Sequence, residues 1–195
     1  NIQTAGGNNI WWARPVPPDA QGQRSIIIPI NMNGITEVHT LINTTNGLPG
    51  PSVYACIEFF GSSGAYYRQD LIGNSDIRDY LLGNLTNNIN GTSTINVFKA
   101  GSGFHNEVRL DKQCIHLAQC ATAFATQRLD HIVISDWGGS NQEIFIAGIT
   151  LSQEISNPIK LFVKSDASGS GTGLNWTDAF TQLSDAILYA YNNSD

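Results

Sequence analysis

One pattern constrains the fold of this chain more than any other feature. From Ser25 to about Leu151, short runs of β-branched and aromatic residues alternate with turns rich in Gly, Asn and Ser. Such spacing is typical of β-sandwiches and barrels, in which short strands follow one another through tight turns. The runs predicted as strands are SIIIPI, TEVHTLI, SVYACIEFF, AYYRQDLI, STINVFKA, EVRLDKQCIHL, DHIVISDW and EIFIAGITL.

Several of these runs also alternate with period two, so that one face of each strand is apolar. In the third run, the face expected to point into the core carries Val53, Ala55, Ile57 and Phe59. The opposite face carries both apolar and polar residues. We therefore predict an all-β protein whose main body is an antiparallel β-sandwich.

The two ends of the chain differ from this body. Residues 1–24 hold the Trp11-Trp12 pair and prolines 15, 17 and 18, which exclude a central strand or a helix interior. They predict an N-terminal arm or edge segment. Around Pro158 a strand, IKLFVK, leads into a glycine-rich loop and then a helix with Asn175 as its N-cap. The predicted organisation is an arm over 1–24, a sandwich over 25–156 and a strand–loop–helix segment over 157–195.

Charge and hydropathy exclude two classes of function. Only 13% of the 195 residues are charged, the formal net charge is -6, and the ten basic residues are scattered. No patch is therefore expected to bind the phosphate backbone of a nucleic acid. No apolar run approaches the ~20 residues that a membrane-spanning helix needs. Low charge with abundant Gly, Asn, Ser and Thr is typical of extracellular β-proteins, so we expect a secreted or cell-surface location.

Residues 25–151 resemble a galactose-binding-like jelly-roll module of secreted bacterial proteins. The resemblance depends on the order of ITEVHTLINT, GPSVYACIEFFGSSGAYYRQDLIGNSDIRDY, NINGTSTINVF, EVRLDKQCIHL, ATAFATQRL and IVISDWGG. It implies a jelly-roll fold and a binding role. Residues 159–195 resemble the N-terminal cap of a right-handed parallel β-helix. The resemblance depends on the stretch LFVKSDASGSGTGLNWTDAFTQLSDAILYA. The apolar side of that cap implies packing on the sandwich or membership of a longer polypeptide.

No known catalytic motif is recognisable. G-x-S-x-G, H-E-x-x-H, Walker and EF-hand spacings are all missing from the sequence. His131 lies next to Asp130, but neighbours on a strand point to opposite faces, which favours a surface or core-edge histidine. We predict no enzyme activity for these residues, whereas a longer parent protein could be a polysaccharide lyase or hydrolase.

Aromatic residues are the best candidates for ligand contacts. Sugar sites combine an aromatic platform with nearby polar groups, which favours Trp137 in a loop, Tyr66 on a strand and the adjacent carboxylate Asp136. Tyr66 and Tyr67 are expected to face opposite ways, so at most one of them belongs to such a site. The alternative is that these aromatic residues fill the core.

Two further sites are predicted with an alternative for each. Asp70, Asp76 and Asp79 surround Arg78, and their carboxylates could bind Ca²⁺; the alternative is a salt bridge of Arg78 with capping aspartates. Cys114 and Cys120 could form a disulfide around a strand end, or all three cysteines could be core thiols.

The function expected from these features is non-catalytic binding of a glycan or a cell-surface polymer. One alternative is a self-associating structural subunit of an extracellular fibre or surface assembly. Another is an N-terminal accessory part of a β-helix enzyme that degrades polysaccharides.

Overall fold

The structure is a computed structural model that describes residues 10–13, 24–51, 53–137, 142–153 and 160–192. Its chain divides into two compact units, Asn1–Glu154 and Ile155–Asp195. Most of the predicted arm, including its prolines, lies outside the described residues, as does the predicted boundary between residues 156 and 157.

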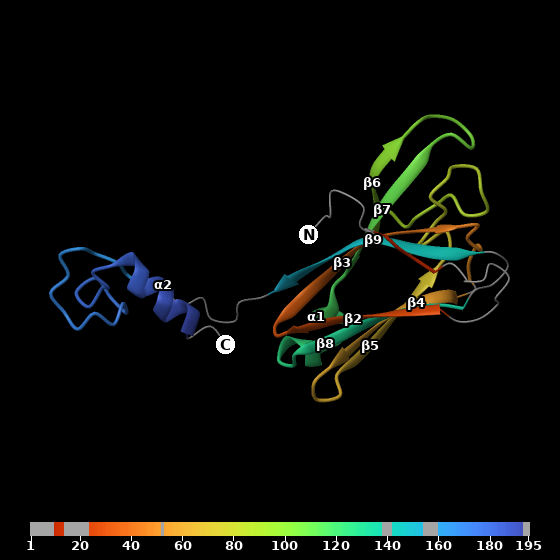
Figure 1. The fold of residues 1–195 in the computed structure, drawn as a ribbon. Helices are drawn as coiled ribbons and strands as arrows, with labels where there is room; N and C mark the ends of the chain where they lie inside the picture. Colours follow the sequence, from red (N-terminus) through yellow and green to blue (C-terminus); the bar gives the residue numbers. More distant parts are fainter. Residues whose placement is uncertain (1–9, 14–23, 52, 138–141, 154–159, 193–195) are drawn as a thin grey trace. The chain divides into compact units, whose positions relative to one another are not determined.

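The N-terminal unit is a sandwich of two antiparallel sheets (Figure 1). The five-stranded sheet has the order β1-β9-β3-β7-β6, and the four-stranded sheet has the order β2-β8-β4-β5. The strands are β1 (Trp11–Trp12), β2 (Arg24–Met32), β3 (Ile35–Thr45), β4 (Val53–Gly61), β5 (Tyr66–Ile72), β6 (Thr94–Ala100), β7 (Val108–Ile115), β8 (Leu129–Asp136) and β9 (Glu143–Gln153). A short helix, α1 (Leu117–Cys120), and a 3₁₀ helix (Thr122–Ala125) connect β7 to β8.

The strand pairing is nested, as in a long hairpin folded over on itself. Strand β1 pairs with β9, β2 with β8, β3 with β7, and β4 with β5, and successive pairs alternate between the two sheets. This is the topology of a jelly roll, to which β6 adds an edge strand. Every run predicted as a strand in the sandwich forms one, so the predicted fold class is confirmed.

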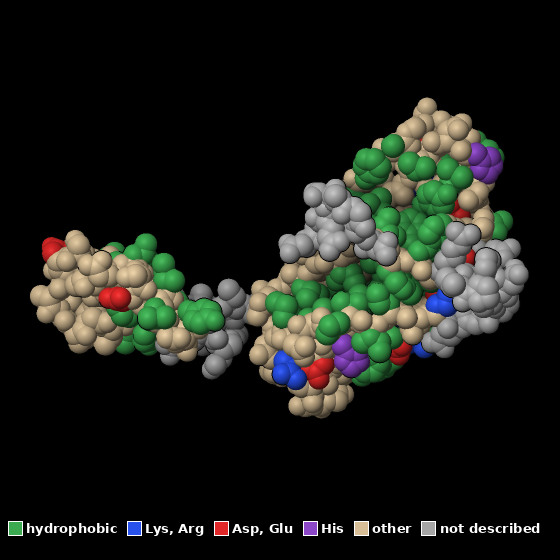
Figure 2. All heavy atoms as spheres, in the orientation of Figure 1, with side chains coloured by type: hydrophobic (Ala, Val, Ile, Leu, Met, Phe, Trp, Pro, Cys, Tyr) green, Lys and Arg blue, Asp and Glu red, His purple; other side chains and the backbone are tan. Residues whose placement is uncertain are grey.

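The core lies between the sheets because alternate side chains of each strand point inward. Ile57 and Phe59 of β4 and Ile132 of β8 are fully buried there, and Figure 2 shows hydrophobic side chains gathered between the sheets. Full burial of one such side chain stabilises the fold by about 1.5–3 kcal/mol.

The tryptophan pair lies at an edge, as predicted. Trp11 and Trp12 form the outermost strand of the five-stranded sheet, with Trp11 opposite Ile146 and Trp12 opposite Phe145. Trp11 packs against the core, whereas Trp12 is 45% exposed.

The C-terminal unit contains helix α2, Leu183–Asn192. The predicted N-cap at Asn175 is wrong, because the chain turns there and then pairs with the preceding segment instead of starting a helix. An isolated parallel bridge joins Val163 to Phe180 and is all that is present of the predicted IKLFVK strand within residues 160–192. No helix in the described part of the chain is long and apolar enough to cross a membrane.

Candidate binding face on the four-stranded sheet

The side of the four-stranded sheet that points away from the core carries side chains in three cross-strand rows. Register pairing across β2, β8, β4 and β5 defines them. We call this surface the outer face; its rows are Ser25–Ser135–Cys56–Asp70, Ile27–Val133–Glu58–Arg68 and Pro29–His131–Phe60–Tyr66. In the third row, His131, Phe60 and Tyr66 are neighbours on three adjacent strands. Since side chains at every second position of a strand share a face, all three rings point to the same side of the sheet.

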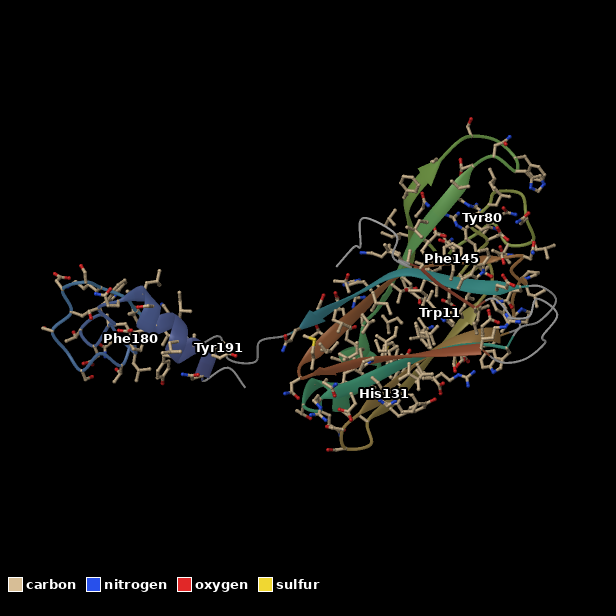
Figure 3. The ribbon with its side chains drawn as sticks, viewed as in Figure 1. Trp11, Tyr80, His131, Phe145, Phe180 and Tyr191 are labelled. Carbon is tan, nitrogen blue, oxygen red and sulfur yellow. The ribbon has the colours of Figure 1, made fainter. Side chains whose placement is uncertain are left out.

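The rings of this aromatic row contact one another. Phe60 and His131 stack with centroids 4.7 Å apart and planes 8° apart, and Phe60 and Tyr66 lie 5.2 Å apart in a tilted arrangement. Tyr66 is 50% exposed. Figure 3 shows His131 on the four-stranded sheet, on the side away from the core residue Trp11. The row therefore offers ring surface to solvent on a rigid strand framework.

Polar groups border the aromatic row. The Tyr66 hydroxyl donates a hydrogen bond of 2.7 Å to Glu58, and Arg68 Nε donates one of 2.6 Å to Asp70. The hydrogen bond to Glu58 raises the pKa of Tyr66 above its usual value, so the phenol stays neutral. These contacts hold the side chains in place and leave further lone pairs for ligand hydroxyls.

Trp137 extends the outer face at the far end of β8. Its backbone N–H donates to the carbonyl of Tyr54 at 3.0 Å, and the guanidinium of Arg68 lies 5.1 Å from the centre of its ring. That cation–π contact orients the indole ring. Trp137 lies six positions after His131, which corresponds to about 20 Å along an extended strand. Tyr66 and Trp137 therefore lie on one extended surface.

Asp136 does not lie on that surface. Its side chain is fully buried, and Oδ2 accepts hydrogen bonds from the backbone N–H of Ile144 at 2.8 Å and from the Gln142 amide at 3.3 Å. It connects the end of β8 to the start of β9, and a ligand on the outer face would not contact it.

The three aspartates predicted to bind calcium point to different partners. Asp70 pairs with Arg68, Asp76 accepts from the Ile72 N–H at 3.1 Å, and Asp79 accepts from the Leu81 N–H at 2.8 Å. Among the described residues the structure does not gather them as a set of metal ligands. The alternative to a calcium site was a set of aspartates that cap backbone N–H groups, and Asp76 and Asp79 do so.

Arg78 forms a salt bridge, but with a partner that the sequence did not indicate. Its Nε and Nη2 atoms bind both oxygens of Asp111 on β7, at 2.8 and 2.7 Å. Asp111 is fully buried and also accepts from the amides of Asn43 and Asn96, at 2.7 and 3.1 Å. This network fastens the long segment between β5 and β6 to the five-stranded sheet.

The cysteines are free thiols in this structure. Cys56 is buried, Cys120 is exposed at the end of α1, and Cys114 lies on β7, 3.9 Å from His116. The predicted bridge between Cys114 and Cys120 is therefore not formed. Of the core-thiol alternative, only the burial of Cys56 agrees with the structure, and its side chain lies in the first row of the outer face, not in the core cluster.

Sequence reasoning selected Tyr66 and Trp137 as candidate ligand contacts, and the structure places both on the outer face; it did not select their neighbours Phe60, His131, Glu58 and Arg68 for this role. The sequence does contain a signal for the pairing of Phe60 with Tyr66. The short turn in FFGSSGAYY sets these two residues opposite each other, because the length of a hairpin loop fixes the strand register. Tyr67 points the other way and stacks on Phe59 at 6.0 Å, which confirms that the two tyrosines face opposite sides.

Comparisons of this chain with protein-family models, with curated proteins and with solved structures each found no match. The fold and the outer face are therefore the basis for the functional argument.

Proposed function

We propose that the sandwich is a non-catalytic binding module for an extended carbohydrate or cell-surface polymer, in a secreted or cell-surface protein. The observation that carries this proposal is the aromatic row of Phe60, His131 and Tyr66 on the outer face, in which Tyr66 is exposed and the other two rings are half-buried.

The chemistry of this face matches that of a sugar. A pyranose ring has an apolar side of C–H groups and a rim of hydroxyls, so it stacks on aromatic rings and bonds to polar groups beside them. Glu58 and Asp70 offer acceptors, and Arg68 offers donors. Because two carboxylates accompany a single guanidinium in the three rows, the face favours a neutral polymer over a sulfated or phosphorylated one.

The length of the face favours a chain of sugars. The surface from His131 to Trp137 extends about 20 Å, which exceeds the size of one pyranose ring several-fold. Affinity should therefore rise with the length of the oligosaccharide until the face is covered.

The test compares Tyr66→Ala with Phe98→Ala, which removes a similarly exposed ring from β6 in the other sheet. Loss of an exposed stacking ring costs about 1–2 kcal/mol of binding free energy, which corresponds to a roughly 5–30-fold weaker affinity. Affinity electrophoresis in gels containing neutral polysaccharides identifies a ligand, and calorimetry then measures each variant. Equal binding by wild type and Tyr66→Ala, or equal loss in both variants, would contradict the proposal.

A second candidate is self-association as a structural subunit, and strand β6 favours it. This edge strand of the five-stranded sheet exposes Ile95, Val97 and Phe98 by 37%, 47% and 56%. Unpaired edges with apolar side chains act as templates for pairing with another chain. Light scattering should then show oligomers that dissociate in Val97→Lys, and a strict monomer at all concentrations would exclude this candidate.

The third candidate, an accessory part of a β-helix enzyme, is favoured by the C-terminal unit. Its exposed apolar side chains are those that the first coil of a β-helix would cover: Leu174, Trp176, Leu183, Ile187 and Leu188. The reading frame of the gene tests this proposal, since β-helix coils would have to follow this segment.

A further inference from the structure

A cluster of metal-ligating side chains lies on the five-stranded sheet, separate from the outer face described above. Glu37 and His39 are on β3, and Cys114 is directly opposite His39 on the neighbouring strand β7. Ser152 is opposite Glu37 on the other neighbour, β9, and His116 follows the end of β7. The neighbouring strands β3 and β7 (Figure 1), with the residue that follows β7, thus bring a carboxylate, two imidazoles and a thiol together, and β9 adds a hydroxyl.

The distances between these groups are those of ligands around one ion. Glu37 Oε2 lies 3.1 Å from His39 Nε2, and one ligand atom each of Glu37, His39 and Cys114 lie within 4.8 Å of one another. Cys114 Sγ lies 3.9 Å from His116 Nε2. Around a tetrahedral Zn²⁺, bonds of about 2.0–2.3 Å place neighbouring ligand atoms about 3.3–3.8 Å apart. The ligand atoms of Glu37, His39 and Cys114 are therefore close to that spacing, and His116 contacts two members of this trio, Glu37 and Cys114.

A hydrogen bond also orients His116 for metal binding. His116 Nδ1 lies 2.9 Å from Glu37 Oε1. A proton on Nδ1 makes this bond and leaves the lone pair of Nε2 on the side of Cys114. Carboxylates commonly hold a ligating histidine in this way. The polar contacts of His39 are all at Nε2, to Glu37 and to Ser152 Oγ at 3.3 Å, while its buried Nδ1 has no partner in the described structure. A metal ion on Nε2 would replace the proton that this atom donates to Glu37.

A nucleophilic cysteine is the competing explanation, because Cys114, His116 and Glu37 follow one another as in a catalytic triad. One observation disfavours it. His39 would have no role in such a triad, although its Nε2 lies 3.1 Å from Glu37 Oε2 in the same cluster.

We propose that Glu37, His39, Cys114 and His116 form a binding site for a borderline divalent transition-metal ion, with Zn²⁺ as the best match. Thiolate and imidazole ligands select such ions, whereas Ca²⁺ requires oxygen ligands. A bound ion would crosslink β3 to β7 next to α1. The proposal is independent of the carbohydrate-binding proposal, since the two sites occupy different sheets.

The test uses the reduced, chelator-treated full chain and three variants: Cys114→Ser, His39→Gln and the control Cys120→Ser, which removes an exposed thiol outside the cluster. Calorimetry with Zn²⁺ should give one ion per chain for wild type and the control, and at least tenfold weaker binding for the two cluster variants. Co²⁺ should give the visible absorption of tetrahedral thiolate coordination only where Cys114 is present. Thermal melting without metal verifies that each variant is folded.

Alkylation of the thiols provides a second readout within one molecule. Zn²⁺ should protect Cys114 from iodoacetamide and leave Cys120 reactive. Equal Zn²⁺ affinity in wild type and both cluster variants would overturn the proposal, as would wild-type protein that binds no ion. Alkylation of Cys114 that is faster than that of Cys120 and unaffected by Zn²⁺ would support the nucleophile instead.

Discussion

Replacing Arg78 by Met should destabilise the sandwich strongly, because it removes the cation that neutralises a buried carboxylate. The Arg78 side chain is 11% exposed and that of Asp111 is fully buried. Arg78 supplies two of the four side-chain hydrogen bonds to Asp111, at 2.8 and 2.7 Å. Breaking a buried pair by removing one partner costs about 3–5 kcal/mol. Because Arg78 retains some solvent contact, we expect about 3 kcal/mol.

The double variant Arg78→Met/Asp111→Asn tests whether the loss of stability comes from the unpaired buried charge of Asp111. A neutral amide at position 111 leaves no buried charge, and its single oxygen can still accept from either Asn43 or Asn96, which bond to different oxygens of Asp111. The second substitution should therefore restore stability by about 1–2 kcal/mol. Urea denaturation followed by far-UV circular dichroism at the β-sheet band measures both free energies of unfolding, since the strands are in the N-terminal unit. A loss below 1 kcal/mol in Arg78→Met, or no recovery in the double variant, would refute the reasoning.

Three other consequences can be measured. Hydrogen bonds from Ser170 and Asn175 lower the pKa of Asp178 below its ordinary value of 3.8. The ionised carboxylate therefore stabilises the C-terminal unit at every pH above the pKa of the unfolded state. This stabilisation is lost as the pH falls through the pKa of the folded state. Asp178→Asn should abolish this acid-dependent step in NMR spectra, and an unchanged step would exclude Asp178 as its source. Burial raises the pKa of Cys56 to about 11, so at pH 8 iodoacetamide should label Cys120 well before Cys56; equal rates would contradict the buried position. Phe59→Ala should lower the free energy of unfolding by about 3–5 kcal/mol, and a loss under 1 kcal/mol in the urea midpoint analysis would mean that the ring is not in the core.

The strands of the sandwich were predictable because their signal is local. In β2, Ser25, Ile27 and Pro29 are exposed while Ile26, Ile28 and Ile30 pack against the core, as period-two alternation requires. The nested strand order is not local, and it entered the prediction only through the resemblance to a jelly roll.

The start of the C-terminal helix was predicted incorrectly for a physical reason. Asn175 does accept a hydrogen bond from the N–H of Asp178, at 2.9 Å, as an N-cap residue would. However, the N–H of Phe180 bonds to the carbonyl of Phe162, which ties this segment to the preceding chain. That long-range pairing overrides the local capping signal, and the helix begins at Leu183.

The candidate site was only partly predictable. Tyr66 and Trp137 could be selected as aromatic residues on a strand and in a loop, but the row that Tyr66 completes depends on the register of three strands. Asp136 looked like a surface carboxylate because Trp137 follows it, yet its side chain turns inward to bond Ile144. The carboxylates around Arg78 suggested an ion site, whereas the partner of Arg78 is 33 residues away at Asp111.

The most direct measurement of the central claim is an NMR titration of the wild-type chain with a neutral polysaccharide fragment selected by affinity electrophoresis. The largest shift changes should fall on the outer-face residues of β4, β5 and β8 and on the Trp137 indole that follows β8, and they should include the His131 ring. Shift changes confined to the five-stranded sheet or to the C-terminal unit, or no response to any neutral glycan, would contradict the claim.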